Sequence, residues 1–565
     1  MDQIFRGARL MTCLLIGTSF GGGQALARMH EEAASAPHIV KKSERASAPG
    51  VAGPIVTTPL GQVQGSVTNG VASFLGMPFA QPPVGALRWT DPQPASPWSG
   101  VRNATQYSAY CPQGFSEIGA GGGVEDCLYI NVQKPANALP GANLPVMFWI
   151  YGGGLLTGSG LEYDGTSMVN TGNVIYVTFN YRLGYLGFLA LSALTAENPN
   201  ARSGNYGLLD QQAALSWVRQ NISAFGGNPK NITIFGESAG GLSTISQLVS
   251  PRVGQIHGAI IESGAYAQTF PTLAAAQTAD TSVATSLGCT STVAATLLSC
   301  LRAIPAATLV SAQTSAVGGA GVGPNIDNYM LTEQPFAAFL DGHFARVPIV
   351  DGTNHDEARL FISEDELLGG SPFTTASFTA LLDSVTSSAV SIYPVADYTS
   401  PNYAAAAAET DYTFSCPAYL LNAYASQYVP VYSYEFADPH WPNEYLPPDP
   451  NMPVIGDPHA SELTYLYPQY HVPYLGYPPA YSKFSPIQKA LAATMQSYWT
   501  NFAWYGRPIA PRGGSWPQYS ASRVNVLSLV PPSPNLTSSF YSFHHCDFWT
   551  PFLIEQAGLP AGSAS

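Results

Sequence analysis

Charged side chains are scarce in this chain of 565 residues. Asp, Glu, Lys and Arg make up only 10% of the sequence, the net charge is −14, and the isoelectric point is near 5.1. Nucleic acids and anionic membrane surfaces attract basic proteins, so neither is an expected partner. Hydrophobic residues reach 46%, which is enough for a large core.

Apolar runs long enough to span a bilayer are also lacking. The apolar segment from Leu10 to Phe20 is too short, but it follows Arg6 and Arg9 and precedes Ala25-Leu26-Ala27. This order is typical of an export signal that ends in a small-residue cleavage site. We therefore expect a secreted protein, or a periplasmic one if the source is bacterial.

The rest of the chain has no long internal linker. We expect a signal peptide over residues 1–27, a flexible leader over 28–53, which has no periodicity, and a single folded domain over 54–565. The last residues, Glu555 to Ser565, are small and polar, so no membrane anchor is expected there.

The seven cysteines include no pair with the C-x-x-C spacing of a zinc or redox site. Cys13 lies in the expected signal, which leaves an even number for disulfides in an oxidising compartment. Six cysteines allow about 15 pairings. Pairing nearest neighbours along the chain gives Cys111–Cys127, Cys289–Cys300 and Cys416–Cys546.

One stretch organises the chain's chemistry. Ile232 to Phe235 is β-branched and aromatic, as a buried strand should be, and Ala239 to Leu248 has helical apolar spacing. Between them lies Gly-x-Ser-x-Gly, with Ser238 on the bend. Such a turn requires small residues, and the helix start offers free N–H groups to a developing negative charge. We predict that Ser238 is a nucleophile.

Strands and helices alternate through most of the sequence, which favours a mostly parallel sheet covered by helices on both faces. The expected strands are Leu144–Tyr151, Val174–Tyr181, Ile232–Phe235, Gly258–Glu262, Val347–Asp351 and Val429–Phe436. The clearest expected helices are Gly207–Phe225 and Ser485–Tyr505, the second with Ser485 as N-cap, Pro486 in the first turn and Gly506 at its end. In such a sheet the chemistry gathers at the carboxyl ends of the strands.

A nucleophilic serine needs oxyanion donors, a base and a carboxylate. The triplet Gly152-Gly153-Gly154 follows an apolar strand and is suited to pointing backbone N–H groups at one centre. Spacing alone leaves the other two partners open. Candidate acids are Asp351, Asp356 and Glu357, and candidate bases are His440, His459 and His471.

The chain resembles the type-B carboxylesterase family, which includes cholinesterases, bile-salt-activated lipase, fungal lipases and bacterial para-nitrobenzyl esterases. The resemblance covers residues from about 51 to 554 and rests on several motifs in the family's order. These are Phe74-Leu75-Gly76-Met77-Pro78-Phe79-Ala80, Glu125-Asp126-Cys127-Leu128-Tyr129-Ile130-Asn131, Phe179-Asn180-Tyr181-Arg182, Gly204-Asn205-Tyr206-Gly207-Leu208-Leu209-Asp210-Gln211 and the serine motif. The resemblance implies an α/β-hydrolase fold.

Two further motifs that resemble the family's imply the partners of Ser238. Gly352-Thr353-Asn354-His355-Asp356-Glu357 implies Glu357 as the acid, and Gly456-Asp457-Pro458-His459 implies His459 as the base. The oxyanion hole would then be formed by Gly153, Gly154 and the amide of Ala239.

Supporting roles are implied as well. The resemblance places Glu237 beside the nucleophile and Ser263 near the acid, and it agrees with the three disulfides above. It also implies two structural ion pairs, Arg88 with Glu125 and Arg182 with Asp210.

The expected activity is hydrolysis of small-molecule carboxylic esters through an acyl-enzyme, with no metal or organic cofactor. Short- to medium-chain or aryl esters are the expected substrates. The loop between Cys111 and Cys127 has no tryptophan, unlike the choline-binding loop of cholinesterases, and is too short for a lipase lid. Leu155 also replaces the family's usual aromatic residue. The alternatives are a lipase on longer acylglycerols and a non-catalytic adhesion protein on the same fold.

Overall fold

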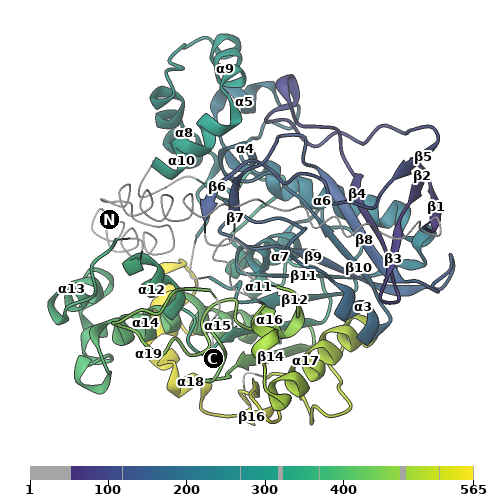
Figure 1. Cartoon of the computed structure of the whole chain (residues 1–565). Helices are drawn as coiled ribbons and strands as arrows, with labels where there is room; N and C mark the ends of the chain where they lie inside the picture. Colours follow the sequence, from purple (N-terminus) through teal and green to yellow (C-terminus); the bar gives the residue numbers. More distant parts are fainter. Residues whose placement is uncertain are drawn as a thin grey trace, which may run out of the picture.

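A large sheet runs through the centre of the molecule (Figure 1). The computed structural model describes residues 53–563 except 117–118, 267–268, 316–321, 368, 444, 471–478 and 521, so the expected signal peptide and nearly all of the leader lie outside the described residues. In the described chain this sheet has 11 strands in the order β16-β15-β14-β13-β12-β11-β9-β10-β8-β4-β3. Its parallel strands are β10 (Ile175–Phe179), β9 (Leu144–Ile150), β11 (Gly227–Glu237), β12 (Gly258–Glu262), β13 (Ile349–Asn354), β14 (Val431–Phe436) and β15 (Val526–Leu529).

Antiparallel strands finish the sheet at both edges. They are β8 (Tyr129–Pro135), β4 (Val71–Pro78) and β3 (Ser66–Thr68) at one edge and β16 (Asn535–Thr537) at the other. Two small sheets lie outside the main one, formed by β1 (Ile55–Thr58), β2 (Gly61–Gln64) and β5 (Val101–Asn103), and by β6 (Gln113–Ser116) and β7 (Gly119–Gly122).

Helices cover both faces of the sheet. Helices α3 (Thr166–Gly172) and α17 (Pro486–Tyr505) contact each other and lie side by side in Figure 1. Helices α6 (Tyr206–Asn221), α7 (Ala239–Val249) and α15 (Cys416–Ala425) pack on β11, β12, β13 and β14. The predicted helix-covered, mostly parallel sheet is therefore confirmed.

The sequence pattern explains why these elements form. Every residue of β9, β10 and β12 is buried, as continuous apolar runs require of strands covered on both faces. The hydroxyl of Ser485 accepts a hydrogen bond from the N–H of Gln488 in a capping box at the start of α17, and Gly506 ends the helix in the left-handed conformation. The predicted helix Gly207–Phe225 has a different end, because Ile222–Phe225 forms a separate 3₁₀ turn.

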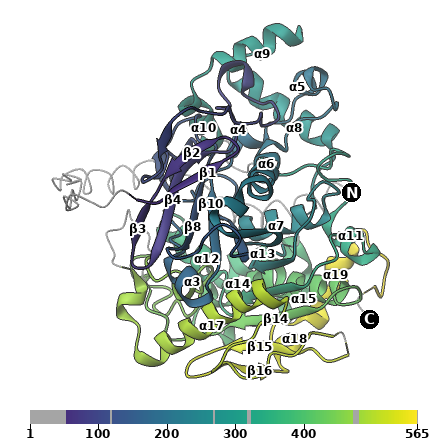
Figure 2. The ribbon, with the colours of Figure 1, turned by 90° about the vertical axis from the view of Figure 1, so that its right-hand side faces the viewer.

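A smaller lobe projects from the body, at the top of Figures 1 and 2. It contains α5 (Ser192–Glu197), α8 (Leu273–Ser286), α9 (Ala294–Ala303) and α10 (Ala306–Ser315), and it has its own apolar cluster. No single helix in the described chain is long and apolar enough to cross a membrane, although Ala294–Ala303 and Ala306–Gln313, bent by 95°, pass that test as a pair.

Covalent and ionic links hold distant segments together. The structure contains the three disulfides expected from the sequence, Cys111–Cys127, Cys289–Cys300 and Cys416–Cys546. The last closes a separation of 130 residues and ties the C-terminal helix α19 (Cys546–Gln556) to α15. The structure also contains the two expected ion pairs. Arg88 Nη2 lies 2.5 Å from Glu125 Oε1, and Arg182 Nη2 lies 2.7 Å from Asp210 Oδ1.

Several carboxyl groups lie in surroundings that disfavour their ionisation. Burial raises the pKa values of Glu162, Glu262 and Glu409 to about 8. Both carboxyl oxygens of Glu409 lack a hydrogen-bond partner among the described residues. The buried His544 has a raised pKa as well, but in its case the charged form is favoured. Burial opposes the charge, yet Asp411 and Glu435 on either side raise the pKa of His544 to about 10.

These shifts predict that stability falls as pH rises from about 5 to 8. The glutamates titrate near pH 4.3 when unfolded, so across this range the folded chain binds more protons than the unfolded chain, at a cost of about 1.4 kcal/mol per pH unit for each extra proton. His544 acts in the same direction above pH 6.5, because its folded pKa exceeds its unfolded value. Urea unfolding at pH 5 and pH 8 measures the effect.

Glu409→Gln isolates one contributor. The neutral amide cannot ionise, so the variant should lose less stability than the wild type between pH 5 and 8. Equal losses in the two proteins would contradict the assignment of a raised pKa to Glu409.

Candidate active site

The turn at Ser238 is strained in the way that a nucleophile elbow requires. Strand β11 ends at Glu237, α7 begins at Ala239, and Ser238 between them has φ 57° and ψ −126°. A Cβ atom at Gly236 would lie 2.3 Å from the carbonyl oxygen of Ile150, and one at Gly240 would lie 2.0 Å from it. The backbones therefore approach too closely for side chains, which confirms why glycines flank this serine.

The carboxylate of Glu357 is fixed by its neighbours. This fully buried residue follows β13, and its Oε1 accepts hydrogen bonds from the Ser263 hydroxyl (2.5 Å) and the Asn354 N–H (2.8 Å). Its Oε2 lies 2.6 Å from Nδ1 of His459. Ser263, which follows β12, and the Asn354 N–H thus both hold Oε1, while Oε2 faces the imidazole.

The imidazole of His459 presents Nδ1 to Glu357 and Nε2 to the side of Glu237. A carboxylate opposite Nδ1 favours the tautomer with the proton on Nδ1, so that Nε2 is the basic nitrogen. Nε2 is buried and has no hydrogen-bond partner among the described residues, although it lies 3.0 Å from Oε1 of Glu237. In that tautomer Nε2 carries a lone pair that can accept a proton.

The Ser238 hydroxyl lies in the same cluster, where Tyr266 is its hydrogen-bond partner. Ser238 Oγ is 3.0 Å from the Tyr266 hydroxyl. The ring of Phe414, in the π-helical turn η5 (Asp411–Ser415), packs 5.3 Å from Tyr266 and 5.2 Å from His459. Glu237 lies next to Ser238 in the chain and contacts His459. The structure therefore gathers Ser238, Glu357 and His459 at the carboxyl ends of β11, β12 and β13.

The glycine triplet lies against the nucleophile. A Cβ atom at Gly152 would come within 3.0 Å of Ser238 Cβ, whereas one at Gly154 would meet nothing within 4 Å. Gly153 has φ 96° and Gly154 has φ 62°, values that suit glycine. Ala239 is the first residue of α7, where backbone N–H groups have no intrahelical partner.

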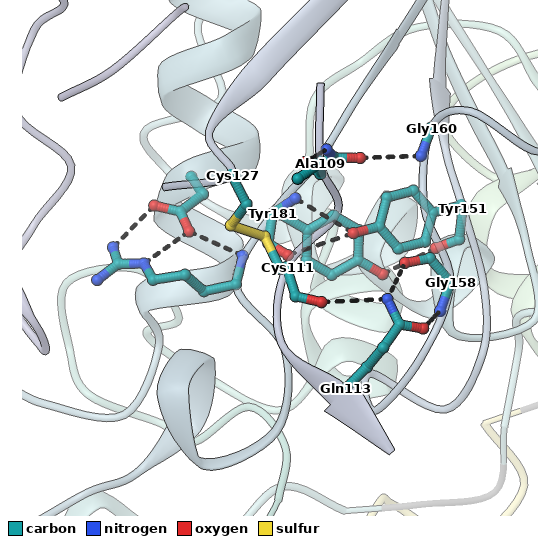
Figure 3. Close-up of a disulfide and its surroundings, with 11 residues drawn as sticks. Ala109, Cys111, Gln113, Cys127, Tyr151, Gly158, Gly160 and Tyr181 are labelled. Carbon is teal, nitrogen blue, oxygen red and sulfur yellow. Dashed lines mark hydrogen bonds and ion pairs between the residues drawn. A yellow bond between two sulfur atoms is a disulfide. The ribbon is translucent and has the colours of Figure 1, made fainter. Parts of the chain in front are cut away.

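A disulfide supports the segment that follows the triplet (Figure 3). The Gln113 side chain, close to Cys111 and the Cys111–Cys127 bond, accepts a hydrogen bond from the Gly158 N–H (2.8 Å) and donates one to the Gly158 carbonyl (3.0 Å). On the other side, Tyr151 and Tyr181 stack at 4.4 Å. These contacts fix both ends of the glycine segment.

Further carboxyl groups surround the histidine. Burial, followed by the negative charges of Glu357 and Glu262, raises the pKa of Glu237 well above its usual range. Glu462, which accepts a hydrogen bond from Asn354 at 2.5 Å, has its pKa raised mainly by burial. His459 therefore lies between two carboxyl groups, with Glu237, whose ionisation is disfavoured, opposite Nε2 and Glu357 opposite Nδ1.

The other candidates from the sequence lie elsewhere. Asp351 is buried within β13 and Asp356 forms an ion pair with Arg359 at 2.8 Å, so neither is the carboxyl that meets His459. His440 is exposed, and His471 lies outside the described residues. Sequence reasoning missed Tyr266 and Phe414, which carry no motif. Asn354 lies within the acid motif that ends at Glu357, and Glu462 lies three residues after His459, so these two residues stand in or near motifs.

Two clusters in the described chain have the donor atoms of a metal site. One is Glu333, Asp341 and His343 at the surface, and the other is His355, Asp356 and Asp457 beside the loops of Glu357 and His459. In the second, burial opposes ionisation of Asp356, but the His355 hydrogen bond and the Arg359 charge lower its pKa to about 2. The Asp356 carboxylate is therefore already paired with a cationic side chain, the guanidinium of Arg359.

The Pro-rich stretch before His459 lines a cavity of about 180 Å³. Its wall includes Trp441, Asp449, Met452 and Gly456.

Comparison with known proteins gives matches over most of the chain. The model of the Carboxylesterase family matches residues 52–549. Para-nitrobenzyl esterase of Bacillus subtilis (strain 168) is 37% identical over 496 residues, covering 84% of this chain and 94% of its own. Cocaine esterase of Homo sapiens is 33% identical over 540 residues, covering 88% and 91%. A solved structure of PNB esterase aligns with a TM-score of 0.73 at 33% identity, covering 87% of this chain and 98% of its own.

Proposed function

Because the chain belongs to the carboxylesterase family, we propose that it hydrolyses carboxylic esters with a triad of Ser238, His459 and Glu357. The observation that carries this proposal is the hydrogen-bonded series from Ser263 through Glu357 to Nδ1 of His459. It ends in a buried Nε2 that has no hydrogen-bond partner among the described residues and belongs to the same cluster as a serine at a strained strand-to-helix turn.

In the proposed mechanism each step of the reaction has a residue that carries it. His459 Nε2 takes the proton of Ser238 Oγ while Oγ attacks the ester carbonyl carbon, and the N–H groups of Gly153, Gly154 and Ala239 stabilise the oxyanion. The imidazolium then gives its proton to the alcohol oxygen, and the carbon–oxygen bond breaks. Water then attacks the acyl-enzyme while His459 takes its proton, and His459 gives that proton to Ser238 Oγ as the carbon–Oγ bond breaks and the acid leaves.

We propose short- to medium-chain or aryl esters as substrates. The loop between Cys111 and Cys127 has no tryptophan to face a quaternary ammonium group, and it is short. Phe361 and Phe414, whose rings are 5.0 and 5.2 Å from His459, provide apolar contacts next to the base. The similar proteins above include a para-nitrobenzyl esterase and a cocaine esterase, which is consistent with small substrates.

A series of para-nitrophenyl esters tests this assignment. We expect kcat/KM to be highest for acetyl to hexanoyl esters and to fall by about 10-fold or more for palmitoyl esters, with little turnover of butyrylcholine. A preference for the palmitoyl ester that increases above its solubility limit would favour the alternative, a lipase.

The three disulfides support secretion into an oxidising compartment. We propose that residues 1–27 direct this export and are removed after Ala27. N-terminal sequencing of the exported protein tests this cleavage, and retention of Met1 in the exported protein would contradict it.

A further inference from the structure

A phenol contacts the proposed nucleophile. The hydroxyl of Tyr266 lies 3.0 Å from Ser238 Oγ, and either oxygen can be the donor. Tyr266 follows Ser263 by three residues, just beyond β12, and it is neither fully buried nor fully exposed. The phenol is therefore partly accessible to solvent beside the serine.

The phenol is on the side of the serine where the base lies. Phe414 packs edge-on against Tyr266 at 5.3 Å and lies 5.2 Å from His459. Phe361 stacks on Phe414 with an angle of 4° between the rings and lies 5.0 Å from His459. The Phe361–Phe414 stack thus holds the phenol and the imidazole on one shared support.

The alcohol oxygen must leave from this same side. His459 gives its proton to that oxygen, so the oxygen has to lie near Nε2 when the carbon–oxygen bond breaks. The glycine segment lies beside Ser238, because a Cβ atom added at Gly152 would come within 3.0 Å of Ser238 Cβ, and it is the expected binding place of the carbonyl oxygen. In the tetrahedral intermediate Ser238 Oγ and the alcohol oxygen are bonded to one carbon, so a group that reaches one is close to the other.

The phenol keeps its proton in this environment. Burial, followed by the negative charge of Glu237, raises the pKa of Tyr266 well above 10. It is therefore a neutral O–H donor throughout the neutral pH range.

We propose that Tyr266 is a further catalytic residue that holds Ser238 Oγ in the free enzyme and then donates its hydrogen bond to the departing alcohol oxygen. This inference rests on the proposed role of Ser238. Oγ becomes a poorer acceptor once it is bonded to the acyl carbon, while the alcohol oxygen gains negative charge and becomes a better one. The hydrogen bond transfers no proton, because the proton of the alcohol comes from His459.

The Tyr266 hydroxyl should influence which leaving groups the enzyme turns over efficiently. An alkoxide concentrates its charge on one oxygen, whereas a nitrophenolate spreads the charge over its ring. Hydrogen bonds to charged oxygens are stronger than those to neutral ones. Tyr266 therefore matters most for esters of alkyl alcohols, which are poor leaving groups.

Tyr266→Phe removes the hydroxyl and keeps the ring against Phe414. The measurement is kcat/KM, which reports acylation, for ethyl butyrate and para-nitrophenyl butyrate, two esters with the same acyl group. We expect a loss of about 10- to 100-fold for the ethyl ester, as for one hydrogen bond to a charged group, and less than about threefold for the aryl ester. Retained aryl turnover also shows that the variant is folded.

Tyr428→Phe is the matched control, because the exposed hydroxyl of Tyr428 donates to the Leu340 carbonyl on another part of the surface. Its ratio of ethyl to aryl turnover should equal that of the wild type. If Tyr266→Phe lowered kcat/KM equally for the two esters, or for neither, and Ser238→Ala were inactive, the role of Tyr266 would be wrong and the proposed function would stand. If Ser238→Ala turned over both esters normally, the proposed function and this inference would both be wrong.

Discussion

Ser238→Ala should yield a folded protein whose kcat/KM for para-nitrophenyl butyrate is lower by at least about 10⁴-fold. The alanine lacks the oxygen that attacks the ester carbonyl, and neither Glu237 nor Tyr266 can replace it as a covalent nucleophile in the proposed mechanism. The structural cost is small, because the only hydrogen bond that the side chain makes among the described residues is to Tyr266.

The control for this variant is Ser497→Ala on α17. Ser497 is half-buried, and its hydroxyl donates to the carbonyl of Ala493 in the preceding turn. We expect wild-type activity from Ser497→Ala and unchanged melting temperatures for both variants. Turnover by Ser238→Ala within 10-fold of the wild type would place the nucleophile elsewhere.

Glu357→Gln should lower kcat by about 10⁴-fold, as amide replacement does at the corresponding acid of other serine hydrolases. The amide oxygen can keep the hydrogen bonds from Ser263 and Asn354, so its NH₂ group is turned toward Nδ1 of His459. An NH₂ donor at that position forces the imidazole proton onto Nε2. The histidine then cannot accept the proton of Ser238.

Asp356→Asn provides the comparison, because the two carboxylates are adjacent in the chain. The Asp356 carboxylate faces Arg359 at 2.8 Å, so its loss should lower kcat by less than about 10-fold and act mainly on stability. Steady-state kinetics of the two purified variants decides between them. A larger loss in Asp356→Asn than in Glu357→Gln would mean that the wrong carboxylate has been assigned.

Regular periodicity explains why the fold could be predicted from the sequence. The predicted strand Gly258–Glu262 has the same bounds as β12, and Leu144–Tyr151 differs from β9 by one residue. The errors occur where the backbone departs from the apolar pattern. Strand β11 begins at Gly227, before the apolar run from Ile232, because Gly227 pairs with Leu144 across a register shift.

The site could be predicted only where a motif carries it. Ser238, Glu357 and His459 stand in short motifs that the resemblance identifies. Tyr266 lies in a loop and Phe414 in a π-helical turn. Such segments have no repeating apolar pattern from which the direction of a side chain could be predicted. Their contacts with the triad arise from tertiary packing between segments that are far apart in sequence, which spacing cannot predict.

Mass spectrometry of the protein after reaction with a fluorophosphonate tests the central claim most directly. Such reagents form a stable bond only with a serine whose hydroxyl is activated by a base and whose oxyanion is stabilised. We predict one adduct per chain, on Ser238, and none in Ser238→Ala or after unfolding. An adduct on another residue, or no adduct on the folded wild-type protein, would contradict the account.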